Sequence, residues 1–143
     1  MTILQIDRTS AFNPMALIGW SIAEQDERSL ALAEVDLTKV SFEMILKERE
    51  SSVAHEEKLK HLKNAGHIRL DVKVFQILWE NQHLIPESWK DHPYILFEGT
   101  VLRGSDGCLC VLCLYWWHGE RHWRCLGLGY RSVIDSVSAV LAS

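Results

Sequence analysis

Residues 108–117 read CLCVLCLYWW, and His118, His122 and Cys125 follow within eight positions. Thiolate and imidazole groups are the ligands that structural Zn²⁺ takes up in tetrahedral sites. One interpretation of this stretch is therefore a metal site whose ligands are Cys110, Cys113, His118 and Cys125.

The same ten residues are typical of a buried β-strand. Side chains alternate between the two faces of a strand, so Cys110 and Cys113 point to opposite faces, which argues against a shared metal ion. Cys110 and Cys125 share a face but lie several residues out of register, so a disulfide is not favoured either. We expect small buried thiols that stay reduced, with no cofactor.

A second constellation consists of Glu98, His122 and Arg124. A carboxylate and an imidazole can exchange protons near neutral pH, and a guanidinium can stabilise developing charge. This is the enzymatic alternative, with Glu98 and His122 as the acid–base pair. Its weakness is that the two residues fall on outer strands at different heights.

The pattern from Tyr94 onward predicts the strands that would position these groups. Three β-like segments are separated by the turns GSDG and HGER, which indicates a three-stranded antiparallel meander. Counting outward from the turns pairs Arg103 with Cys108 and Trp117 with His122.

This register gives the meander one apolar face, which should be core. Trp116 lies opposite Trp123 on that face, and Val101 belongs to it as well. The second face becomes aromatic and cationic toward HGER, with Tyr115 close enough to Arg124 for a cation–π contact and Trp117 between Tyr94 and His122.

Aromatic side chains and arginine dominate the binding energy of protein interfaces. The leading functional hypothesis is therefore a non-enzymatic binding or self-association module whose partner is a protein or a second copy of the chain. Its proposed contact residues are Tyr94, Tyr115, Trp117, His122 and Arg124.

Two helices joined by a short turn are expected before the meander. The first spans 52–64. The second begins at an N-cap, Asp71, covers 72–82 and has Leu70 placed to pack on Phe75. Its apolar side chains do not suit a DNA-reading helix, and they predict packing against the sheet instead.

The N-terminal part is less regular. ILQI at 3–6 predicts a short strand, 29–36 favours a strand although it contains helix formers, and 38–47 fits either kind of element. The sequence as a whole predicts one α+β domain over 1–143, with a helical pair packed on the C-terminal three-stranded meander and one or two additional N-terminal strands.

Composition restricts the class of partner. The chain has 143 residues, of which 48% are hydrophobic and 24% charged, and its formal net charge is −4. That charge disfavours nucleic acid, which needs clustered basic residues. With no signal-like start and no apolar run long enough to span a bilayer, we expect a cytoplasmic protein.

Five stretches carry a resemblance to a known group of proteins. They are EQDERSLALAEVDL, EEKLKHLKNAGHIRLD, FQILWENQHLIPESWK, GTVLR and the terminal SAVLAS. With these the chain resembles short uncharacterised proteins of candidate-phylum bacteria, over nearly its whole length. The resemblance implies no activity, ligand or site residue.

Overall fold

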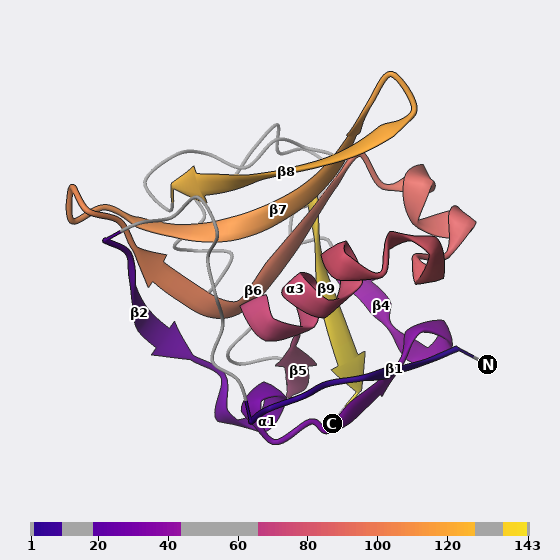
Figure 1. The fold of residues 1–143 in the computed structure, drawn as a ribbon, viewed down its shortest axis with the longest axis horizontal. Coiled ribbons are helices and arrows are strands. Elements are labelled where there is room, and N and C mark those ends of the chain that lie inside the picture. The colour runs from indigo at the N-terminus through magenta and orange to yellow at the C-terminus, as the bar shows by residue number, and fades with distance from the viewer. Residues whose placement is uncertain (1, 10–18, 44–65, 128–135, 143) are drawn as a thin grey trace.

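The computed structural model describes residues 2–9, 19–43, 66–127 and 136–142. Half of these residues belong to a seven-stranded sheet and a separate two-stranded sheet (Figure 1). The large sheet consists of β2 (Ser21–Gln25), β4 (Ser41–Glu43), β5 (His67–Arg69), β6 (Tyr94–Arg103), β7 (Leu109–Trp117), β8 (Glu120–Gly127) and β9 (Ser136–Ala142). The small sheet pairs β1 (Ile3–Gln5) with β3 (Glu34–Asp36).

Helices are few and short in the described part. The α-helices are α1 (Glu27–Leu30) and α3 (Val72–Glu80), and the 3-10 helices are η1 (Leu37–Lys39), η2 (Gln82–Leu84) and η3 (Glu87–Asp91). The predicted fold class, a helical pair on a three-stranded meander, is therefore wrong. The meander exists as β6, β7 and β8, but it is part of a larger mixed sheet.

The strand order along the sheet is β4-β9-β6-β7-β8, with β2 paired to β6 and β5 paired to β9. All these pairs are antiparallel except β6 with β9, which is parallel. The sequence did not predict β9 as a strand. It also did not predict β5, which occupies the expected turn between the two helices because its residues pair with β9.

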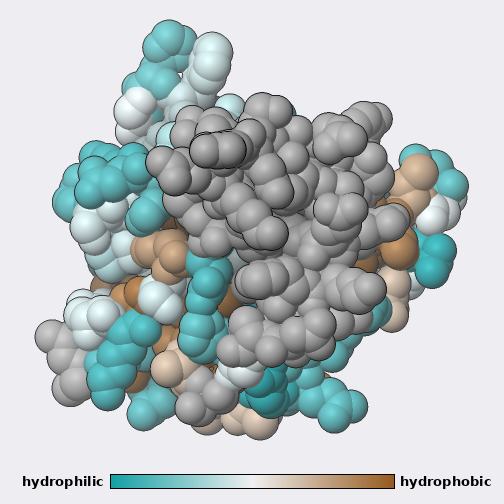
Figure 2. Space-filling view, turned by 180° about the vertical axis from the view of Figure 1, so that it is seen from behind, coloured by the Kyte–Doolittle hydropathy of each residue, from teal (hydrophilic) through white to brown (hydrophobic). Residues whose placement is uncertain are grey.

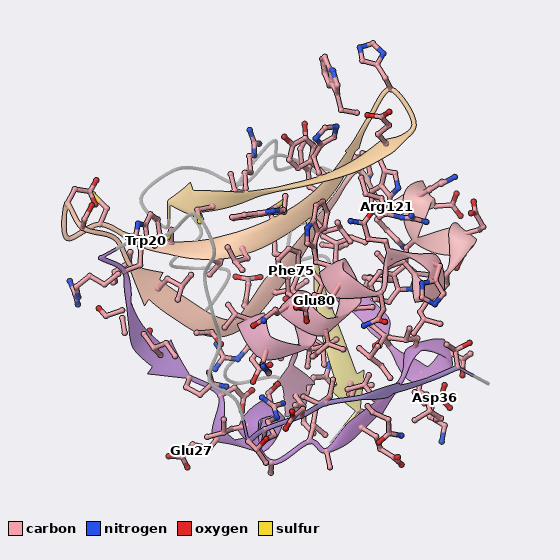
Figure 3. All side chains as sticks on the ribbon, in the orientation of Figure 1. Trp20, Glu27, Asp36, Phe75, Glu80 and Arg121 are labelled. Carbon is pink, nitrogen blue, oxygen red and sulfur yellow. The ribbon has the colours of Figure 1, made fainter. Side chains whose placement is uncertain are left out.

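The helix α3 forms where its N-cap signal predicts it. Asp71 accepts a hydrogen bond from the backbone N–H of Val74 at 3.0 Å, and Leu70 and Phe75 are both buried in the main core. Phe75 packs edge-on against Phe97 of β6, with ring centroids 5.3 Å apart, and Figure 3 shows it between the helix and the sheet. This confirms that the apolar face of the meander is core and that α3 covers it.

The second hairpin turns one residue earlier than predicted. His118 and Gly119 both have positive φ, 51° and 77°, as a two-residue type I′ loop requires. Trp117 therefore pairs with Glu120, Tyr115 with His122, and Trp116 with Arg121. The predicted pairs Trp117 with His122 and Trp116 with Trp123 are wrong, although the side chains of β7 and β8 keep their predicted faces.

The first hairpin differs because β6 is irregular. Arg103 pairs with Leu109 rather than with Cys108, and the register shifts between Phe97 and Leu102. This shift turns Val101 away from the main core and into a second apolar cluster with Val111.

Gly99 lies in the irregular part of β6. Its N–H donates to the carbonyl of Leu70 at 2.9 Å, and its carbonyl accepts from the N–H of Asp26 at 2.7 Å. A Cβ atom built on Gly99 would lie 2.2 Å from the carbonyl oxygen of Arg69. The absence of a side chain is what lets the chain after β5 cross β6 here.

The N-terminal predictions have mixed outcomes. The strand expected at 3–6 is confirmed as β1, but it belongs to the small sheet. The strand expected at 29–36 is wrong in its first half, because its first residues belong to α1, which Asp26 caps. The last part is extended as β3. The expected helix at 52–64 lies outside the described residues.

None of the helices in the described ranges has the length and apolar character needed to span a membrane. Seen from behind, the periphery of the described part carries mostly hydrophilic side chains, with smaller hydrophobic areas at the sides (Figure 2).

Candidate functional site

The predicted binding residues come from three neighbouring strands of the meander. Tyr94 of β6 is the direct partner of Tyr115 of β7, and Tyr115 is the direct partner of His122 of β8. The rings stack in a row across the strands, with centroid distances of 6.1 Å for Tyr94–Tyr115 and 5.5 Å for Tyr115–His122. We call these three residues the aromatic row.

Arg124 lies over this row. Its guanidinium carbon is 5.4 Å from the ring centroid of Tyr115 and 5.6 Å from that of Tyr94. Both distances are within the range in which a cation is attracted to an aromatic face. The predicted contact of Arg124 with Tyr115 is confirmed, although the direct strand partner of Arg124 is Cys113 rather than Tyr115.

Trp117 does not lie between Tyr94 and His122 as predicted. It lies two residues after Tyr115 on the same face, at the end of β7, in a hairpin that extends away from the rest of the molecule (Figure 1). Its side chain is 63% exposed and packs edge-on against His118 at 4.8 Å between ring centroids. The structure thus brings the aromatic row and Arg124 into contact, and Trp117 lies exposed beside them.

The acid–base pair is not assembled. Glu98 is buried within β6, four positions from Tyr94, and His122 lies two strands away at the height of Tyr94. Strand spacing and rise per residue place their Cα atoms roughly 16 Å apart. Two side chains at that separation cannot share a hydrogen bond.

The four alternative metal ligands are not brought together at one point. Cys110 and Cys125 are on the core face, Cys113 is fully buried on the other face, and His118 is at the hairpin tip. Within the described ranges, no three His, Cys, Asp or Glu side chains are grouped so that they could hold a metal ion.

Cys110 and Cys125 are closer than the sequence predicted. Leu112 is the direct partner of Cys125, so Cys110 is its diagonal neighbour, and the two thiols are hydrogen-bonded. For Cys110, this hydrogen bond and burial both raise the pKa. For Cys125, the same hydrogen bond lowers the pKa and outweighs burial, which acts in the opposite direction. The predicted register did not bring the two thiols together, because it centred the second hairpin one residue too late.

A different influence acts on Cys108, which is exposed in the first hairpin loop. The Asp106 side chain hydrogen-bonds to its thiol and raises the pKa of Cys108. Asp106 Oδ1 also accepts from the backbone N–H of Cys108 at 3.0 Å. An asparagine could keep that backbone hydrogen bond without the negative charge.

We therefore expect Asp106→Asn to accelerate alkylation of Cys108 by iodoacetamide at pH 8. Lowering the pKa increases the thiolate fraction, about tenfold for each full pKa unit, and the thiolate is the reactive form. Mass spectrometry of the modified peptides measures the rate at each cysteine. Cys125 provides the internal control, and an unchanged rate at Cys108 would contradict the role given to Asp106.

A buried polar network, which no sequence pattern indicated, lies at the other end of the sheet. Asp26 Oδ2 lies 3.4 Å from Arg69 Nε, and both residues are buried. Nearby, Asp71 Oδ2 accepts from Arg8 Nη1 at 2.8 Å and from Gln25 Nε2 at 3.0 Å. These contacts join segments distant in the sequence, and their evident role is structural.

The comparisons with known proteins add no family. No protein-family model matches the chain, and searches of curated proteins and of solved structures found no match either. Function has to be inferred from the residues themselves.

Proposed function

We propose that the chain is a non-enzymatic self-association module that binds a second copy of itself through the aromatic row, Arg124 and Trp117. The observation that carries this proposal is that His122 and Arg124 lie on the outer strand β8, with Tyr115 and Trp117 on the adjoining strand β7. Among the described residues, β8 pairs with β7 alone.

The backbone of β8 supports pairing with another strand. Residues flanking a two-residue hairpin loop exchange hydrogen bonds, so the outward backbone groups of β8 belong to alternate residues, Arg121, Trp123 and Cys125. An edge of this kind can pair with an identical strand, and two-fold symmetry makes such a contact antiparallel and self-complementary. His122 and Arg124, on β8 itself, would then face their counterparts in the second copy.

The exposed side chains near this edge also favour self-association. Three large hydrophobic side chains of the described part are exposed, namely Ile22, Leu30 and Trp117. Of these, Trp117 is next to an aromatic row and a cation, and tryptophan, tyrosine and arginine are the residues most enriched in interface hot spots. Ile22 and Leu30 have no such surroundings among the aromatic contacts of the described residues.

Multi-angle light scattering over a concentration series tests the proposal. We expect a monomer–dimer equilibrium in which Trp117→Ala and Arg124→Ala each weaken the dimer about tenfold or more, because removing a hot-spot side chain typically costs more than 1 kcal/mol. Leu30→Ala is the matched control, since it removes an exposed apolar side chain on α1. A monomer at every concentration, or equal effects of all three substitutions, would rule out this function.

A further inference from the structure

A polar cleft lies on the opposite side of the hairpin from the aromatic row. Its volume is about 430 Å³, and it opens between the hairpin tip and the segment that carries η2 and η3. It is lined by Gln82, Lys90, Gly119, Glu120 and Arg121. Figure 3 shows Arg121 on the side of β8 that faces these 3-10 helices.

Arg121 contributes a buried donor that no residue of the described ranges satisfies. Its Nε is buried and has no hydrogen-bond partner among the described residues. Trp116, the direct partner of Arg121 in β7, has a buried Nε1 in the same situation. Both groups can only donate hydrogen bonds, and leaving such a group unsatisfied costs about 1–3 kcal/mol. Two neighbouring donors with no partner in the described part of the chain are suited to an acceptor that a ligand supplies.

The charges around the cleft indicate which acceptor fits. Arg121 and Lys90 supply two positive charges and Gln82 supplies an amide, while Glu120 is the acidic residue of the lining. Lys90 Nζ also forms an exposed ion pair with Glu87 at 2.8 Å. Exposed pairs of this kind are weak, so the ammonium can turn to a ligand at little cost. A guanidinium presents parallel N–H groups that match the oxygens of carboxylate or phosphate.

We propose that this cleft binds an oxyanion, the carboxylate or phosphate group of a small molecule, between Arg121 and Lys90. The cleft lies on the other face of β8 from the aromatic row, because Arg121 and Arg124 point to opposite faces of that strand. Its ligand would be small, given the volume of the cleft and the acidic residues at its rim.

The Nε–H of arginine and the Nε1–H of tryptophan both give signals in ¹H–¹⁵N correlation spectra, so the site can be observed directly. We expect the signals of Arg121 and Trp116 to shift saturably as phosphate or acetate is added from about 0.1 to 50 mM at constant ionic strength, with millimolar affinity for the preferred anion. The two titrations distinguish phosphate from carboxylate.

Arg121→Gln keeps a polar side chain of similar length and should raise the dissociation constant about tenfold or more, as followed by the Trp116 signal. Arg103→Gln removes an exposed guanidinium of the other hairpin and should leave it unchanged. The backbone spectrum reports whether each variant is folded. Signals that do not saturate with either anion, or a titration that persists in folded Arg121→Gln, would overturn the proposal.

Discussion

Alanine at position 99 is expected to lower the free energy of unfolding by about 3 kcal/mol or more, or to prevent folding altogether. The new Cβ atom would lie 2.2 Å from the carbonyl oxygen of Arg69 and 2.7 Å from the carbonyl carbon and oxygen of Leu70. These are backbone atoms held by β5 and by the hydrogen bond from Gly99 to Leu70, so they cannot move away independently. Urea denaturation followed by circular dichroism measures the loss.

Gly107→Ala is the matched control. A Cβ atom added at Gly107 would meet nothing within 4 Å, but the residue has a φ of +87°, so its substitution costs backbone strain alone, about 1–2 kcal/mol. A smaller effect at Gly99 than at Gly107 would contradict the close crossing of the chain over β6.

Asp26→Ala should cost about 3–5 kcal/mol of folding free energy, because it leaves the buried guanidinium of Arg69 without its carboxylate. It also removes the N-cap of α1, since Asp26 Oδ1 accepts from the N–H of Arg28 at 3.0 Å. The double variant Asp26→Ala, Arg69→Met should be less unstable than Asp26→Ala alone. Equal stability of the single and double variants would show that the two charges are not coupled.

The same carboxylate makes stability depend on pH. Burial is the largest influence on the pKa of Asp26 and would raise it, but hydrogen bonds from Arg28 and Arg69 and the charge of Arg69 together hold it below 3.8. Its contribution is therefore complete above the unfolded value and is lost as the pH falls through the folded value. We expect Asp26→Asn to flatten the decline of stability below about pH 4, compared with the unmodified chain.

The parts of the fold that local rules control were predictable. Asp71 and the apolar spacing after it define α3, and the alternation in residues 94–127 defines the meander and its core face. The face of each aromatic side chain followed from period-two alternation, so Tyr115, His122 and Arg124 were placed on one surface before their partners were known. A two-residue change in strand pairing leaves each side chain on the same face of the sheet. These three residues therefore share a face as predicted, although the predicted register of β7 with β8 was wrong.

Other features depend on contacts that no local pattern records. His118 adopts a positive φ, which is uncommon in residues other than glycine, and this moved the centre of the turn one residue toward the N-terminus. The parallel pairing of β9 with β6 joins residues some 40 positions apart, and the Asp26–Arg69 contact joins residues 43 positions apart. A short charged segment such as 24–28 looks like surface, and only the tertiary structure buries Asp26.

The place of β9 in the sheet has a consequence for synthesis in the cell. Of the described strands β9 is the last to leave the ribosome, yet it lies in the interior of the sheet, between β4 on one side and β6 and β5 on the other. Until residues 136–142 emerge, β4 and β5 lack their partner among the described strands, and the apolar side chains around Val137 and Ala139 stay uncovered. Until then the nascent chain is incompletely folded, and its unpaired strand edges make it prone to aggregation and to chaperone binding.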